Sequence, residues 1–98
     1  MKVFYTTEVV KIIEKLNYAD QARLTRTRKF FEEYGLKIGP KYVKKITRSG
    51  LWELRAGNIR LFLCIKESLA FGVHLIKKKS QKLPLNELRL AEKRCQQL

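Results

Sequence analysis

Apolar residues recur first with a strand-like and then with a helical period near the start of the chain. Residues 2–6 alternate loosely and are rich in Val, Phe and Tyr, which predicts a β-strand. The next apolar positions follow a helical period on one face, made of Val9, Ile12, Ile13 and Leu16. Thr7 is the expected N-cap and Glu8 suits the first turn, so a helix should begin here.

A second helix is expected directly after a short break at residues 17–20. Asp20 can cap this helix, which should run to Tyr34 because one face carries Leu24, Thr27, Phe31 and Tyr34. Gly35 supplies the residue that ends it. Two helices separated by so short a break are typical of an α-hairpin.

The second half of the chain changes to a period of two. Gly39 and Pro40 open a basic segment, residues 41–47, which we interpret as a turn or a short helix. Three strands follow at Leu51–Ala56, Ile59–Lys66 and residues 69–78, joined by tight turns at Gly57-Asn58 and Glu67-Ser68. A closing helix should begin near Pro84, and its apolar stripe consists of Leu85, Leu88, Cys95 and Leu98.

The predicted order β-α-α-β-β-β-α defines the fold class. The last three strands form an antiparallel meander, and the first strand must join that sheet to be stable. The α-hairpin then covers one face, which is an α+β fold with a C-terminal helix, formed by residues 1–98 as a single domain. The longest apolar run is residues 61–65, far short of the roughly 20 needed to span a bilayer. With no signal-peptide pattern either, we expect a cytoplasmic protein without membrane contact.

The net charge of the chain indicates which class of molecule it binds. The chain carries 22 Lys and Arg against 9 Asp and Glu, a net charge of +13. Between residues 36 and 82, twelve basic residues are opposed by Glu53 and Glu67 alone, a local charge of +10. Such a field attracts polyanions and releases counterions when phosphate binds. The sequence therefore favours a nucleic-acid partner over a solvated basic face without one.

Strand alternation sorts the side chains of the meander onto two faces. Ile59, Leu61, Leu63 and Ile65 make an apolar face for the helix pair, and Trp52 with Leu54 should join that core. Arg55, Arg60 and Phe62 point the other way, together with Lys77 or Lys78. An electropositive sheet surface that contains an aromatic ring is a plausible RNA platform. The residues expected to contact RNA are Lys41, Lys44, Lys45, Arg48, Phe62 and Lys79.

Most catalytic and metal chemistries lack the residues they need. Glu53 is the one acid of the predicted sheet, and there is no Ser-His-Asp set and no glycine-rich phosphate loop. Cys64 and Cys95 form no CxxC pair and are expected to be reduced core thiols, so neither a metal nor another cofactor is predicted. His74 lies in an apolar strand and is interpreted as a core residue with satisfied hydrogen bonds rather than an acid–base catalyst.

Arginine and lysine can nevertheless cleave RNA. The 2′-hydroxyl is a tethered nucleophile, so an enzyme needs alignment and stabilisation of charge on the phosphorane. Arginine offers a rigid fork for phosphate oxygens, and a lysine crowded by like charges has a lowered pKa and can move protons. Such a crowd is found at Lys77, Lys78, Lys79 and Lys82. A basic strand end that only touches phosphate is the alternative.

Three motifs in order resemble the RelE/ParE toxin superfamily, and most of all its HigB-like, phage-derived branch. They are Gly-Leu-Trp-Glu-Leu-Arg at residues 50–55, Asn-Ile-Arg-Leu-Phe at 58–62, and the run from His74 to Pro84 that contains Lys77-Lys78-Lys79 and Lys82. The sequence Glu-Leu-Arg-Leu-Ala at residues 87–91 completes the resemblance. It implies a RelE-like fold and a type II toxin that cleaves mRNA on the ribosome and is neutralised by a cognate antitoxin. The absence of clustered Asp, Glu, His and Cys ligands in the sequence predicts that this cleavage needs no metal.

The resemblance also implies roles for individual residues. Arg55 and Arg60 would contact phosphate and stabilise the transition state, while Lys77, Lys78 and Lys82 would add charge and transfer protons. Many relatives carry a tyrosine or histidine near the end of the active site, but the closing helix here has neither, so the general base stays open. An acidic or amphipathic antitoxin segment is expected to cover or displace the closing helix at Leu85, Leu88 and Leu98.

Two other functions remain open at this point. A gyrase-poisoning toxin of the same superfamily would bind protein and lack nuclease chemistry. A plain RNA- or DNA-binding module would have neither catalytic activity nor an antitoxin. The dense set of Lys and Arg on the predicted sheet favours RNA cleavage over both.

Overall fold

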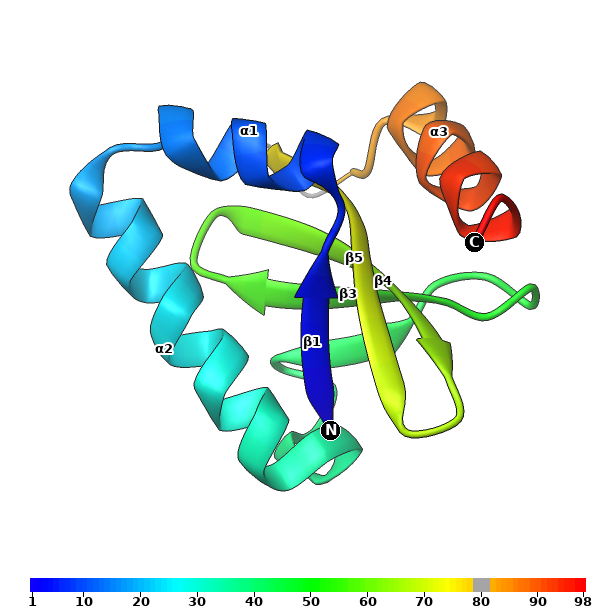
Figure 1. Cartoon of the computed structure of the whole chain (residues 1–98), viewed down its shortest axis with the longest axis horizontal. Helices are drawn as coiled ribbons and strands as arrows, with labels where there is room; N and C mark the ends of the chain where they lie inside the picture. The colour runs from blue at the N-terminus through cyan, green and yellow to red at the C-terminus, as the bar shows by residue number, and fades with distance from the viewer. Residues whose placement is uncertain (79–81) are drawn as a thin grey trace.

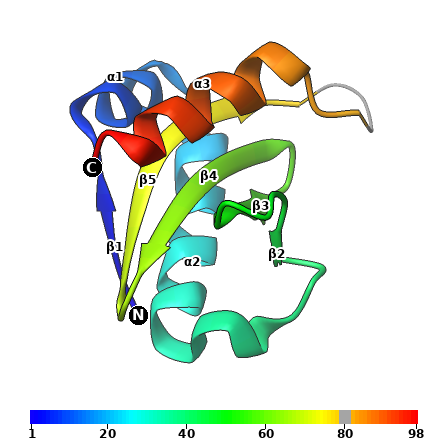
Figure 2. The ribbon, with the colours of Figure 1, turned by 90° about the vertical axis from the view of Figure 1, so that its right-hand side faces the viewer.

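The computed structural model describes residues 1–78 and 82–98 of the chain. Its elements follow one another as β1 (Lys2–Tyr5), α1 (Thr7–Lys15), α2 (Tyr18–Tyr34), the 3-10 helix η1 (Gly35–Ile38), β2 (Val43–Lys45), β3 (Leu51–Ala56), β4 (Ile59–Lys66), β5 (Leu69–Lys77) and α3 (Leu85–Gln96). Figure 1 shows a twisted sheet with α1 and α2 against one face, and Figure 2 shows α3 lying across the other. The predicted α+β class is confirmed.

The sheet has the strand order β1-β5-β4-β3-β2. Strands β2 to β5 form an antiparallel meander, whereas β1 joins the edge of β5 in parallel. The expectation that the first strand enters the sheet is therefore confirmed, although the sheet is mixed rather than wholly antiparallel. The α-hairpin makes this parallel pairing possible because it carries the chain from one edge of the sheet back to the other.

The interpretation of residues 41–47 as a turn or short helix holds at residues 41–42, which form a turn, and is wrong for residues 43–45. Val43–Lys45 forms the edge strand β2, with Val43 opposite Leu54 and Lys45 opposite Trp52. Val43 is buried in the core between the sheet and the helix pair. Pairing with β3, which follows β2 after a short connection, outweighs the local turn signal of Gly39 and Pro40.

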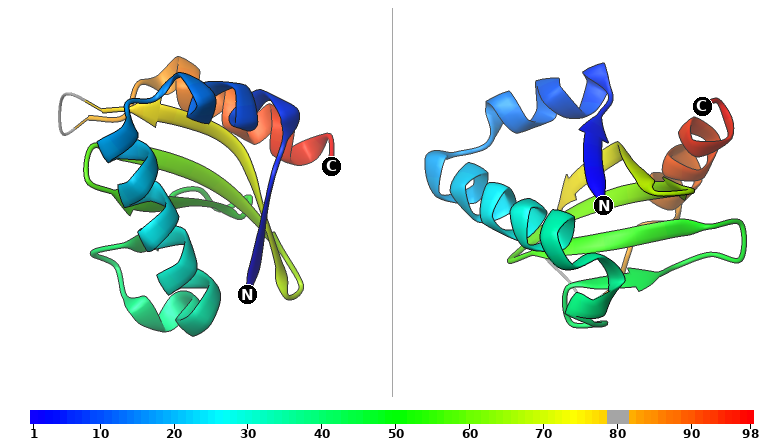
Figure 3. Two further views of the ribbon diagram at one scale, coloured as in Figure 1. Left: turned by 60° about the vertical axis from the view of Figure 1, so that its left-hand side comes forward. Right: turned by 60° about the horizontal axis from the view of Figure 1, so that its bottom comes forward.

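Two hydrophobic cores lie on opposite faces of the sheet. The larger core packs Ile59, Leu61 and Leu63 against α1 and α2, with Leu24 and Phe31 among the buried residues from α2. Trp52 and Ile65 pack against the same core, so the predicted apolar face is confirmed. Figure 3 shows the helix pair and α3 on opposite sides of the strands.

The second core lies between the sheet and α3 and corrects the placement of Phe62. This ring has no exposed surface and packs with Leu51, Cys64, Val73 and Ala91. The prediction that Phe62 is an exposed aromatic for RNA is therefore wrong. Phe62 is buried because α3 covers this part of the sheet face, which alternation along the strands alone left open.

The cysteines and the helix caps also differ from the sequence-based expectations. Cys64 on β4 and Cys95 in the last turn of α3 form a disulfide, so they are not free thiols. Thr6 rather than Thr7 caps α1, because its Oγ1 accepts a hydrogen bond from the Val9 amide. Asn17 rather than Asp20 caps α2, with 2.8 Å between its Oδ1 and the Asp20 amide nitrogen. Among the described residues, no helix has the length and apolar content to cross a membrane.

Candidate active site

Five charged side chains lie on the same face of the sheet as α3. They occupy the end of that face that α3 leaves uncovered. Strand register aligns them, since Lys44 on β2 pairs with Glu53 on β3, and Arg55 pairs with Arg60 on β4. Lys78 follows β5 directly, and its amide donates to the carbonyl of Asn58 at 2.7 Å. The sequence separates these residues by up to 34 positions, and only the antiparallel meander brings them together.

Glu53 is the fully buried centre of this cluster. Its Oε1 accepts a hydrogen bond from Nε of Arg55 at 2.7 Å, and its Oε2 lies 3.8 Å from Nε of Arg60. Two arginines directly opposite each other in a sheet repel, and a carboxylate between them offsets that repulsion. The chain places Glu53 correctly because it stands two residues before Arg55, on the same face of β3.

The guanidinium of Arg60 is held more tightly than that of Arg55. Its Nη1 donates to the carbonyls of Gly57 at 2.5 Å and Ile59 at 3.1 Å, and 15% of the side chain is exposed, against 31% for Arg55. Burial lowers the pKa of Arg60, while the charge of Glu53 acts in the opposite direction. Arg60 is thus a fixed cation and Arg55 a more accessible one.

Lys78 supplies a third cation with altered acidity. Desolvation by burial, followed by the nearby guanidinium of Arg60, lowers the pKa of Lys78 below its ordinary value of 10.5. Arg55 and Lys44 act in the same direction, and Glu53 opposes them. The cluster therefore joins four cations to one carboxylate, which leaves strong positive charge for a bound phosphate group.

The other predicted lysines are not all near this cluster. Lys77 lies on the opposite face, where its Nζ is 2.8 Å from Oδ2 of Asp20 on α2. Lys45 shares that face by register, and Lys41, Lys82 and Arg48 are exposed. Lys79 lies outside the described residues. Of the five residues predicted to be catalytic, the structure brings Arg55, Arg60 and Lys78 together.

His74 belongs to the packing of α3, as the sequence indicated. Its Nε2 contacts the Glu87 carboxylate, and its Nδ1 accepts a hydrogen bond from Nη1 of Arg94 at 3.2 Å. Because arginine only donates, the tautomer that satisfies both contacts carries its hydrogen on Nε2. Both nitrogens are engaged, and the ring stacks on Phe62, so His74 is a buried link between β5 and α3.

The three leucines predicted to contact an antitoxin differ in their exposure to solvent. Leu85 and Leu98 are exposed at the two ends of the α3 region, whereas Leu88 packs partly against the sheet. Across residues 1–78 and 82–98, no group of three or more His, Cys, Asp or Glu is arranged to hold a metal ion. In the described part of the chain, the Arg and Lys side chains of the cluster can bind a phosphate group and stabilise negative charge on it.

Glu53 is the member of this cluster that the sequence analysis did not assign to the candidate site. In the sequence analysis Glu53 was noted as the one acidic residue of the predicted sheet. A single carboxylate is not enough for acid–base catalysis by a carboxylate pair. The signal that could have found it is its spacing to Arg55 on the same strand face, since a buried carboxylate between arginines orients them rather than reacting.

Comparison with known proteins assigns the fold and the family. The structure is similar to a chain in the crystal structure of the archaeal RelE-RelB complex from Pyrococcus horikoshii OT3, with a TM-score of 0.67 and 23% identity over 83% of this chain and 97% of that chain. The fold is thus RelE-like. Residues 11–96 match the family described as phage-derived Gp49-like proteins, and the chain belongs to that family. The resemblance to the phage-derived branch of the RelE/ParE superfamily is confirmed. No curated protein sequence matches the chain significantly.

Proposed function

We propose that this protein is the toxin of a type II toxin–antitoxin system, an mRNA endonuclease that acts on the ribosome and so inhibits translation. The observation that carries the proposal is the pair Arg55 and Arg60, oriented by buried Glu53 beside Lys78. In this proposal residues 1–98 act as one domain, in the cytoplasm, where translated mRNA is found.

The arrangement suits cleavage by the RNA 2′-hydroxyl. The 2′-hydroxyl gives its proton to a solvent water as its oxygen attacks the adjacent phosphorus, the bond from phosphorus to the 5′ oxygen breaks, and the products are a 2′,3′-cyclic phosphate and a 5′-hydroxyl. Arg55 and Arg60 bind the non-bridging oxygens and stabilise the charge that grows on them in the transition state. Lys78, with its lowered pKa, donates a proton to the departing 5′ oxygen more readily than an ordinary lysine.

Two partners follow from this role. The ribosome would align mRNA over the positive cluster, which supplies the positioning that a shallow site on a small domain lacks. A cognate antitoxin would neutralise the protein, and support comes from the similar archaeal chain, which was crystallised as a RelE–RelB complex. No metal or other cofactor takes part in the proposed reaction.

The test is induction of the chain in cells, followed by mapping of mRNA 5′ ends. Wild-type protein should arrest growth and produce new 5′ ends within translated regions, whereas Arg60→Ala and Lys78→Ala should each reduce cleavage by roughly 10²–10⁴. Lys77→Ala is the matched control, because this neighbouring lysine pairs with Asp20 on the other face. It should retain cleavage.

Two outcomes would replace the proposal. Growth arrest with DNA breaks and intact mRNA would indicate a gyrase-poisoning toxin. RNA binding without growth arrest or new 5′ ends, from a well-expressed wild-type chain, would indicate a non-catalytic nucleic-acid-binding module.

A further inference from the structure

A group of aromatic rings, two of them exposed and Tyr42 half-buried, lies where α2 ends and the chain turns toward β2. The ring of Phe30 lies edge-on to Tyr34, with centroids 5.4 Å apart, and to Tyr42, with centroids 5.5 Å apart. Phe30 is 39% exposed and Tyr34 is 53% exposed. We call these three residues the aromatic patch. Figure 3 shows the end of α2 and the segment leading to β2 together at one end of the molecule.

The surroundings of the aromatic patch are basic. The ammonium group of Lys41 lies 5.7 Å from the centroid of the Tyr42 ring. Residues 29–45 carry five exposed lysines against two glutamates, and one of these acids, Glu32, is occupied because it accepts a hydrogen bond from the Val3 amide at 2.9 Å. Exposed rings within positive charge suit a polyanion with flat apolar faces, which describes unpaired RNA.

The aromatic patch meets the candidate active site at Tyr42, at the β2 edge of the sheet, because α2 itself packs on the opposite face. Tyr42 directly precedes β2, and its carbonyl accepts a hydrogen bond from the amide of Arg55 at 2.7 Å. Lys44, two residues further on and about 7 Å along the strand, is among the charges that lower the pKa of Lys78. An RNA strand with one phosphate at Arg55 and Arg60 can therefore follow this edge of the sheet to the exposed rings.

We propose that the aromatic patch stacks unpaired bases of the RNA strand that the candidate active site cleaves, an inference that rests on the proposed function. Phe30 holds the two tyrosines apart and in place through its edge-on contacts, and Lys41 neutralises a phosphate next to the stacked base. The substrate is then single-stranded at this edge, because bases in a duplex cannot leave their own stack without an energetic cost.

The test measures binding of a labelled single-stranded RNA that carries 2′-O-methyl groups throughout, so that cleavage cannot occur. Tyr34→Leu combined with Tyr42→Leu removes both ring faces and should weaken binding by roughly 30-fold or more, since each of the two base–aromatic stacks contributes roughly 1–3 kcal/mol. The double Tyr→Phe variant keeps both rings and should bind as wild type does. A duplex RNA of the same length should bind all variants equally.

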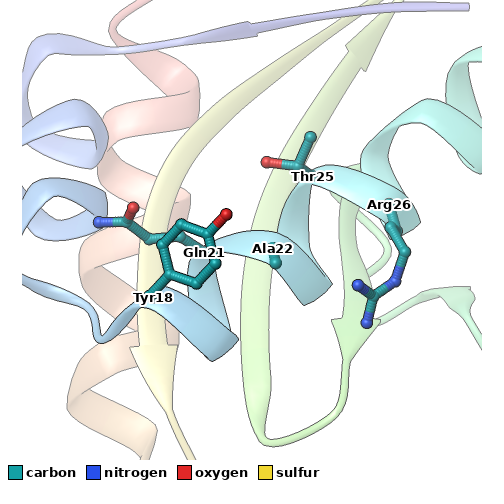
Figure 4. Close-up of a pocket in the computed structure, with 5 residues that line it drawn as sticks. All are labelled: Tyr18, Gln21, Ala22, Thr25 and Arg26. Carbon is teal, nitrogen blue, oxygen red and sulfur yellow. The ribbon is translucent and has the colours of Figure 1, made fainter.

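Tyr18→Leu is the matched control on the same helix. Tyr18 is 86% exposed in the first turn of α2 and borders a shallow hollow lined by Gln21, Ala22, Thr25 and Arg26 (Figure 4). Among the described residues it makes no ring contact with another aromatic side chain. It lies at the end of α2 remote from the aromatic patch, so its replacement should leave the affinity for single-stranded RNA unchanged.

Several outcomes would overturn the inference. Unchanged affinity of the Tyr34→Leu/Tyr42→Leu protein would do so, as would an equal loss with Tyr18→Leu or with duplex RNA. If that double variant bound RNA normally but escaped neutralisation by its antitoxin, the aromatic patch would be a protein-binding surface instead. Failure of the proposed function is seen separately, in the mapping of 5′ ends, because the binding measurement uses RNA that no variant can cleave.

Discussion

Glu53 is a fully buried carboxylate whose two guanidinium partners both reach solvent. Burying the carboxylate is costly, and the two arginines offset that cost only while they stay close. The same contacts hold both guanidinium groups on the open part of the sheet face. Stability and orientation of the candidate site are thus coupled at one residue.

Glu53→Gln should lower the free energy of unfolding by roughly 2–3 kcal/mol. Loss of one member of a fully buried pair costs roughly 3–5 kcal/mol, and the exposure of Arg55 and Arg60 reduces this figure. The measurement is urea unfolding at pH 7. Glu33→Gln, which changes an exposed glutamate on α2, is the control. Equal stability of the two variants would mean that Glu53 does not hold the arginines.

Lys78 should give the protein a distinct pH dependence of stability. Its pKa is lowered in the folded state, so between that pKa and 10.5 the unfolded chain binds more protons than the folded one. Wild-type stability should therefore rise through this window relative to Lys78→Met. Urea unfolding of both proteins between pH 7 and pH 10.5 measures the difference, with Lys29→Met as an exposed control. Parallel profiles for wild type and Lys78→Met would contradict the assignment.

At the scale of elements, α3 depends on a few attachments to the sheet. Arg94 donates to the carbonyl of Val73 at 3.1 Å and to His74, and Glu87 contacts the other imidazole nitrogen. Ala91 is fully buried, and the disulfide fixes the last turn to β4. Cytoplasmic thiols are kept largely reduced, so in the proposed compartment the polar and apolar contacts have to hold α3 without the disulfide.

Reduction of the disulfide, or Cys95→Ser, should destabilise the fold by about 3–4 kcal/mol, because the bond closes a loop with a sequence separation of 31. Amide hydrogen exchange should accelerate in α3 well before it does in β4, which has strand partners on both sides. Glu92→Gln is a control within α3, since it alters an exposed contact with Ser49 and leaves the disulfide intact. Equal acceleration in α3 and β4 would show that the disulfide does not act as a local attachment.

At the scale of the whole molecule, a charge of +13 is carried on a body of 32 × 30 × 26 Å. Such a field speeds encounter with an acidic antitoxin, and screening within about 8 Å at physiological ionic strength slows it. Apolar anchors are insensitive to this screening and set the rate of release. Leu85 and Leu98 are exposed apolar residues available for this purpose on the α3 side.

Binding of the proposed antitoxin should protect residues 77–98 from amide hydrogen exchange. Added salt should slow association while leaving the dissociation rate nearly unchanged, because charge acts on encounter and apolar contact on release. The measurements are exchange on free and bound protein and association kinetics at several salt concentrations. Protection confined to the outer side of α1 and α2, with residues 77–98 unchanged, would show that inhibition works elsewhere.

The sequence by itself determined the features that depend on local period and on charge. Alternation at Ile59, Leu61 and Leu63 identified the face that packs on the helices, and the helical period located α1, α2 and α3. The motifs around Arg55, Arg60 and Lys77-Lys78 led to the correct superfamily. These signals are local because side-chain direction repeats within a few residues of the same element.

Only the tertiary structure decided which residues meet across elements. It formed β2 through pairing with β3, buried Phe62 under α3, and joined Cys64 to Cys95. It also separated two adjacent lysines, sending Lys77 to Asp20 and Lys78 to the side of Arg60. Each outcome depends on a partner in another element, and local periodicity carries no information about which element will pair with or cover a given face.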